Sequence, residues 1–152
     1  TPVKVNVPDL VNTLGNGWEE TERNVMGEWY TYLILAYGRD ASFQIDDETA
    51  KTAAEGWGGD TYVYYDNPAN SQFTFVWLLQ WDTAADADEF YQASLTYGTS
   101  RWGESASTDY GSWQSTADGF VTIRQSGDKV LWLMAPSKAD QTSILNTLPG
   151  MN

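Results

Sequence analysis

Short apolar and aromatic runs, each bounded by turn residues, predict the strands of a β-sheet in this chain. The runs are rich in β-branched and aromatic residues, which favour strands. Ser126-Gly127-Asp128 separates the last two and is typical of a hairpin. Residues 18–25 (WEETERNV) alternate between apolar and polar, which predicts an edge strand with a solvent-facing side. The expected strands lie at residues 18–25, 61–65, 73–81, 112–115, 120–125 and 129–135.

Apolar residues at helical spacing, together with capping residues, predict the helices. Thr83 and Ser137 each begin a capping-box-like sequence, with Asp three residues later where Glu or Gln is usual. Gly56 and Gly98 stand where helices are expected to end. We therefore expect helices over residues 46–55, capped by Asp46 or Asp47, over 83–97 and over 137–148, with a helical turn within 7–14.

Residues 28–37 (EWYTYLILAY) are compatible with a strand or a helix. Their β-branched and aromatic content favours a strand. Trp29, Leu33 and Ala36 fall at helical spacing, and Gly38 follows as a stop. We favour the helix.

These elements predict an α+β fold: an antiparallel sheet of five to six strands with helices packed on one face. Residues 1–9, with Pro2 and Pro8, are expected to form an extended linker, followed by a single α+β domain over 10–152. Residues 99–117, rich in Ser, Thr and Gly, are expected to be a long irregular connection that contains only the one short strand at 112–115.

Composition and charge exclude several classes of function. The 152 residues include no His and no Cys, which rules out Ser-His-Asp or Cys-His nucleophiles, His/Cys zinc sites and thiol redox motifs. A formal net charge of −13 argues against a nucleic-acid partner. No apolar run is long enough to cross a membrane. We expect no metal and no cofactor.

Two acidic motifs are candidates for chemistry. Gly56-Trp57-Gly58-Gly59-Asp60 is interpreted as a structural turn, with a backbone cradle beside an aromatic wall as the alternative. If the glycine pair adopts positive φ there, Val at position 58 or 59 destabilises the domain. Asp82 opens an acid-rich helix start, where the helix dipole favours negative charge. Calcium is the alternative there, but the spacing of a calcium loop is absent.

Aromatic residues in predicted turns and loops are candidates for ligand binding. Trp57, Trp102, Tyr110 and Trp113 lie outside the apolar strand runs. They could stack on sugar rings or fill a partner's pocket, or they could cover the open face of the sheet, which we favour. With Asp60 and Asp82 they form the candidate ligand-binding set. A glycoside hydrolase needs only two carboxylates, but 21 acidic residues make any nominated pair uninformative.

Two segments resemble a domain of uncharacterised bacterial and archaeal envelope proteins. They are AAEGWGGDTYVYY (53–65) and FVWLLQWDTAADADEFYQA (75–93), and NGWEETERNVMGEW (16–29) is similar to the opening strand and Gly-Glu helix start of that domain. In longer members the domain looks like a C-terminal companion of a zinc metallopeptidase-like region bearing H-E-x-x-H. This chain has no His, so no catalytic or metal-binding residue carries over.

The resemblance implies a secreted or cell-envelope location, with lipid anchoring of the full-length protein as one alternative, and it implies no activity. The leading hypothesis is a non-catalytic accessory or interaction domain whose partner is an envelope protein. A small-ligand module, most plausibly for glycans, is the first alternative, and a carboxylate-based glycoside hydrolase is the second.

Overall fold

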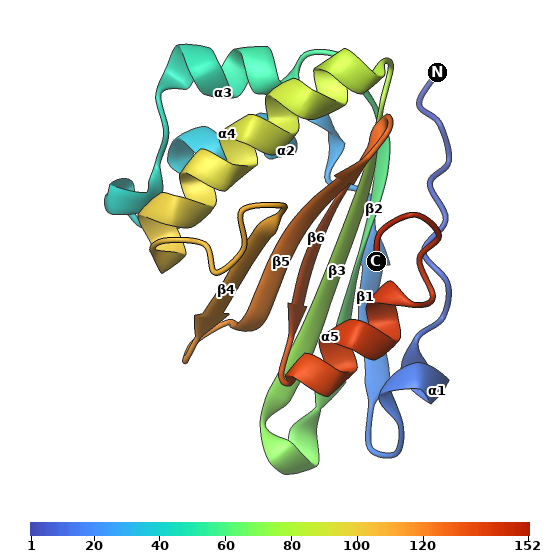
Figure 1. Cartoon of the computed structure of the whole chain (residues 1–152). Coiled ribbons are helices and arrows are strands. Elements are labelled where there is room, and N and C mark those ends of the chain that lie inside the picture. The colour runs from blue at the N-terminus through green and yellow to red at the C-terminus, as the bar shows by residue number, and fades with distance from the viewer.

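A six-stranded antiparallel sheet forms the centre of the computed structural model, which describes residues 1–152 (Figure 1). The strand order is β1-β2-β3-β6-β5-β4, and every neighbouring pair is antiparallel. This confirms the predicted α+β class and the edge position of the first strand. The strands are β1 (Glu19–Asn24), β2 (Trp57–Asn67), β3 (Gln72–Trp81), β4 (Gly111–Ser115), β5 (Gly119–Ser126) and β6 (Lys129–Ala135).

Helices cover both faces of the sheet, so the expectation of one covered face was wrong. One face carries α2 (Gly27–Tyr37), α3 (Asp47–Ala54) and α4 (Ala84–Trp102), and the other carries α1 (Val11–Leu14) and α5 (Lys138–Leu145) (Figure 1). Short 3-10 turns lie at Ala41–Phe43 and Pro68–Asn70. None of these helices combines the length and the apolar character that a membrane span requires.

The central strands explain the two covered faces because their side chains are apolar on both sides. In β3, Trp77 and Leu79 pack under α2–α4, whereas Val76 and Leu78 pack with α5 on the opposite face. Strand β6 repeats the pattern, with Trp132 on the first face. A strand buried on both faces is a continuous apolar run without alternation.

The first nine residues are extended but do not form a separate linker. The backbone N–H of Val3 donates to the Gly58 carbonyl at 2.7 Å. Val5 and Val7 are buried in the second hydrophobic cluster with residues of α5. Alternating apolar residues in this segment pack it onto the domain, beside β2.

Two elements begin or end differently from the prediction, and one that the sequence left ambiguous is resolved. Residues 28–37 form the favoured helix. Strand β2 begins at Trp57 rather than at residue 61, so in the GWGGD motif only Gly56 lies in a turn, and residues 57–60 lie in the strand, with a register shift between Trp57 and Gly59. Neither Gly58 nor Gly59 has a positive φ. Helix α4 continues through Gly98 to Trp102 and ends at Gly103, whose φ is 91°.

Candidate functional site

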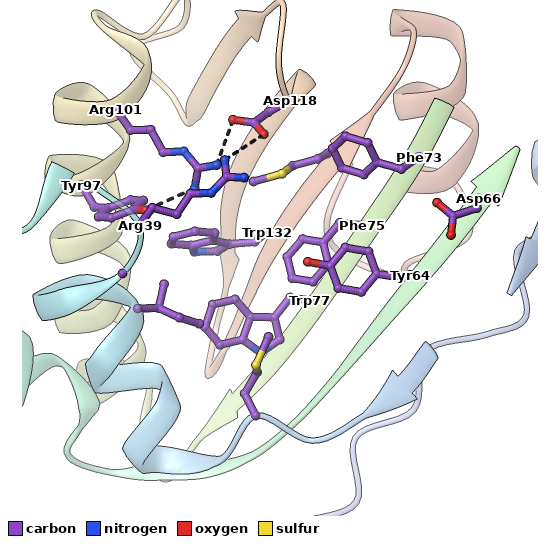
Figure 2. Close-up of a pocket in the computed structure, with 14 residues that line it drawn as sticks. Arg39, Tyr64, Asp66, Phe73, Phe75, Trp77, Tyr97, Arg101, Asp118 and Trp132 are labelled. Atoms are coloured by element: carbon purple, nitrogen blue, oxygen red, sulfur yellow. Dashed lines mark hydrogen bonds and ion pairs between the residues drawn. The ribbon is translucent and has the colours of Figure 1, made fainter. Parts of the chain in front are cut away.

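A pocket of about 530 Å³ lies between helices α2 and α4 and the face of the sheet that they cover (Figure 2). In Figure 1 helices α2, α3 and α4 lie over one end of that face and leave the rest less covered. Strands β2, β3 and β6 supply most of the apolar lining, and α2 and α4 supply the rest. The lining residues are Met26, Ile34, Gly38, Arg39, Tyr64, Asp66, Phe73, Phe75, Trp77, Tyr97, Arg101, Asp118, Trp132 and Met134.

The floor of the pocket is a set of packed aromatic rings. The ring centroids of Trp77 and Trp132 are 5.3 Å apart in an edge-to-face arrangement, and Tyr97 lies 5.6 Å from Trp132. The Trp132 indole N–H donates to the hydroxyl of Ser94 on α4 at 3.3 Å. These contacts fix the rings, which are only 1–2% exposed, so the floor is preformed rather than assembled by a ligand. The accessible apolar surface above that floor comes from the half-buried side chains of Ile34, Tyr64 and Phe73.

An ion pair forms one edge of the pocket. Arg101 of α4 donates to Asp118 at 2.9 Å and to the Tyr97 hydroxyl at 3.2 Å. Asp118 also accepts from the Trp102 indole N–H at 2.9 Å. Both charged side chains are only 10% exposed. Buried charges are tolerated when paired and hydrogen-bonded, and this pair is both.

Arg39 is the second cation at this edge, and its contacts are weaker. Its guanidinium lies 3.7 Å from the Asp118 carboxylate, and its side chain is 62% exposed. The dashed lines in Figure 2 mark the ion pairs and hydrogen bonds at this edge, and the Arg39 side chain takes part only through this longer ion pair. Arg39 is therefore the charged group here that remains available to a ligand.

The opposite end of the pocket carries Tyr64 and Asp66 of β2 (Figure 2). Burial raises the pKa of the Tyr64 phenol, so this hydroxyl stays protonated at neutral pH and can donate a hydrogen bond. Its ring packs on Phe75 with centroids 4.8 Å apart. The pocket thus has a basic edge, an aromatic floor and an acidic far end.

Two of the candidates from the sequence, Trp57 and Asp60, hold the start of α2. Asp60 is 2% exposed and accepts from the backbone N–H groups of Met26 and Gly27 at 2.8 and 2.9 Å. It also accepts from the Trp57 indole N–H at 3.0 Å. All three bonds serve the fold, since a carboxylate at a helix N-terminus satisfies otherwise unpaired donors.

The other candidates are dispersed. Asp82 is exposed, and its backbone N–H donates to the Gly56 carbonyl at 2.7 Å. The Arg124 guanidinium lies over the Tyr110 ring, 3.7 Å from the centroid of that ring. Trp102, the last residue of α4, packs against Trp113 of β4, and their ring centroids are 5.3 Å apart. The structure does not bring the six candidates into one site, and only Trp102 reaches the pocket edge, through Asp118.

Sequence reasoning missed Arg39, Arg101 and Asp118. They come from segments separated by many residues and form no local motif. The sequence shows only that arginine is scarce, with four in the chain. The structure shows that two of the four line this pocket. No group of three or more acidic side chains is placed to hold a metal ion.

Comparison with known proteins gives one family. A profile of a domain of unknown function, DUF8575, matches residues 12–145. No match was found among curated proteins or among solved structures. Because the matched residues include every strand and nearly every helix described above, the chain belongs to the DUF8575 family of domains of unknown function.

Proposed function

We propose that this domain binds a small, mainly apolar organic molecule in the pocket above Trp77 and Trp132. The observation that carries the proposal is a pocket of about 530 Å³ whose accessible apolar lining, Ile34, Tyr64 and Phe73, is supported from beneath by packed aromatic rings. Small-molecule sites are typically apolar clefts of about 300–1,000 Å³ with a few polar groups that set orientation. The ion pair and Arg39 supply such groups here.

The proposed role is binding without catalysis. The pocket offers two carboxylates, Asp66 and Asp118. A glycoside hydrolase would need one of them as a proton donor and the other as a nucleophile or base. Asp118 is instead held by Arg101 and the Trp102 indole, which makes it part of the wall. No observation favours glycoside hydrolysis over binding.

The binding experiment uses the neutral fluorophore N-phenyl-1-naphthylamine, whose emission rises on entering an apolar site. We expect saturable binding to the folded protein. Ile34→Trp places a larger side chain in the pocket and is expected to weaken binding about tenfold, the equivalent of about 1.4 kcal/mol. Tyr30→Trp is the matched control, since Tyr30 lies on the same helix and is 60% exposed. Absence of binding, or equal affinity in all three proteins, would contradict the proposal.

A second candidate function is an accessory or interaction domain in a secreted or envelope protein. It rests on the resemblance of the GWGGD and W-D-T-x-x-D segments, and one structural observation supports it. Helix α2 exposes Trp29, Tyr30 and Tyr37 to 66%, 60% and 59%. Exposed aromatic groups of this kind are typical of protein interaction sites.

The test of this second function is capture from an envelope extract. We expect the native domain to retain a partner that the Trp29→Ser, Tyr30→Ser variant does not. Variants at the pocket, such as Ile34→Trp, should retain the partner, because Trp29 and Tyr30 do not line the pocket. Identical captures by the native and doubly substituted proteins would count against the interaction role.

A further inference from the structure

We infer that the molecule bound in the pocket is an organic anion whose acidic group pairs with Arg39 while its apolar body packs against Tyr64 and Phe73, above the buried rings of Trp77 and Trp132. This inference rests on the proposed function and specifies its ligand class. A carboxylate, sulfonate or phosphate on an aromatic or branched apolar body has the required chemistry, because a guanidinium binds such groups through paired hydrogen bonds.

The first step of the argument is the pairing of charges at the basic edge. Asp118 is neutralised by Arg101 at 2.9 Å, and both are almost fully buried. Arg39 reaches the same carboxylate only at 3.7 Å, beyond hydrogen-bonding distance. The Arg39 guanidinium, with five N–H donors, is therefore without a hydrogen-bond acceptor in the chain, and it lies at the mouth of an apolar pocket.

The second step is the position of Arg39 on the backbone. Arg39 has φ of 55°, in the left-handed region that residues with a side chain rarely adopt. Gly38 before it has no room for a side chain, since an added Cβ would lie 2.5 Å from the Ile34 carbonyl oxygen. The chain thus leaves α2 in a strained turn, and both turn residues line the pocket. Strain of this kind is often kept where it positions a functional group.

The third step is the distribution of charge over the molecule. The chain carries 21 acidic and 8 basic residues, so its surface as a whole repels anions. Two of the four arginines nevertheless meet at this one pocket. A neutral ligand could accept a hydrogen bond from Arg39 but would gain no pairing of opposite charges, which makes the stronger bond. A cationic group at this edge would be repelled by Arg39, and the nearby carboxylate of Asp118 is already paired with Arg101.

The far end of the pocket sets the orientation of the anion. Asp66 lies across the aromatic floor from Arg39 and Asp118 (Figure 2). Its negative charge repels an acidic group, so that group belongs at the Arg39 edge. The Tyr64 hydroxyl points into the space between and makes no hydrogen bond within the chain, which leaves it free to donate to a polar atom of the ligand.

The test compares two probes that differ by one acidic group: 1-anilinonaphthalene-8-sulfonate and its neutral counterpart, N-phenyl-1-naphthylamine. Arg39→Gln is expected to weaken binding of the sulfonate about tenfold, a change of about 1.4 kcal/mol. It should leave the affinity for the neutral probe within about twofold. Lys129→Gln is the matched control, because it removes one exposed positive charge outside the pocket. Ile34→Trp should weaken both probes, which shows that both occupy this pocket.

The outcomes separate the inference from the proposed function. If Arg39→Gln leaves sulfonate binding unchanged, or weakens both probes equally, the inference is overturned while binding in the pocket stands. If neither probe binds the native protein, the proposed function fails and the inference fails with it. A loss of sulfonate binding in Lys129→Gln as large as in Arg39→Gln would show that net charge, and not Arg39, governs affinity, and would also overturn the inference.

Discussion

At the residue scale, close approach of the backbone explains the glycine pair in the GWGGD motif. The segment 1–9 lies along β2, and an added Cβ on Gly59 would lie 2.1 Å from the Val3 carbonyl oxygen. At Gly58 the nearest atom, the Gln80 carbonyl oxygen, would be 3.0 Å away. That larger side chains at positions 58 and 59 destabilise the domain stays a prediction. The positive φ given as its reason was wrong.

Gly59→Ala is therefore expected to destabilise the domain by about 1–3 kcal/mol, because the first segment must move away from β2. Chemical denaturation measures the free energy of unfolding. The control is the same substitution in a chain that lacks residues 1–4, where the atom that the new Cβ would meet is gone. An equal cost in both chains would show that Val3 is not the cause.

Asp82 and Thr83 are adjacent at the start of α4, and only one of them can be its N-cap. The Thr83 hydroxyl accepts from the backbone N–H of Asp86 at 3.1 Å, which makes Thr83 the N-cap. Thr83→Ala is expected to cost about 0.5–2 kcal/mol of unfolding free energy. Asp82→Ala should stay within about 0.5 kcal/mol, because its side chain is exposed and caps nothing. The reverse order in thermal melts would contradict this assignment.

At the element scale, Gly98 shows how packing between elements can override a local stop signal. Glycine in a helical pattern suggested an end, but α4 continues because the residue faces Trp113 of β4. A Cβ at position 98 would lie 2.5 Å from the Trp113 ring. The small residue therefore admits an indole between the helix and the sheet.

Gly98→Ala is accordingly expected to destabilise the domain by about 1–3 kcal/mol through overpacking, although alanine is the better helix former by about 1 kcal/mol. Combining it with Trp113→Leu should remove most of the penalty, because the clashing ring is absent. Thermal melts of the two single variants and the double variant measure the interaction free energy between positions 98 and 113. A stabilising Gly98→Ala would show that helix propensity outweighs the contact.

Helices α2 and α3 are joined by a pH-dependent contact. The Tyr32 hydroxyl donates to the Asp47 carboxylate, and Lys51 lies 2.9 Å from the same carboxylate. The bond from Tyr32, followed by the contact with Lys51, lowers the pKa of Asp47 below its usual 3.8. A lowered folded-state pKa adds stability above the unfolded pKa and loses it as the pH falls through the folded pKa.

Asp47→Asn is thus expected to lower Tm at pH 7, with a difference that is constant down to about pH 5 and narrows below about pH 4. Thermal melts at several pH values test this. Glu89→Gln, an exposed acidic residue in α4 with no ion pair, is the control and should show no such narrowing. A Tm difference that persists at pH 2 would contradict the role assigned to ionised Asp47.

At the scale of the whole molecule, the second hydrophobic cluster depends on residues far apart in the chain. It joins Val5 and Val7 to Val63 of β2, Leu131 of β6 and Ile144 of α5. The Val7 carbonyl also accepts from Arg23 at 2.7 Å. The first segment therefore closes one face of the sheet.

Deleting residues 1–7 is expected to lower the unfolding free energy by about 2–4 kcal/mol, from the loss of two buried valines offset by the entropy of the freed segment. Deleting only Thr1 and Pro2, both exposed, should change it by less than about 0.5 kcal/mol. Urea denaturation measures both. Equal stability of the longer deletion and the native chain would restore the interpretation of this segment as a linker.

The sequence alone determined the local elements and the class of fold. Apolar runs, turn residues and caps act within a few positions of each other, so the hairpin β5–β6, helices α3 and α5, and the antiparallel α+β character could all be predicted. The absence of His and Cys likewise excluded whole classes of chemistry without any coordinates.

Only the tertiary structure decided which residues meet. The unbroken apolar run of β3 could have indicated two covered faces, but it does not say which segments cover them. Arg39, Arg101 and Asp118 lie in three segments and converge because α2, α4 and the turn before β5 pack over the same part of the sheet. Trp57 and Asp60, which the sequence marked as a site, serve to hold α2. Contacts between distant segments depend on how the helices pack on the sheet, and local spacing in the chain carries no record of that packing.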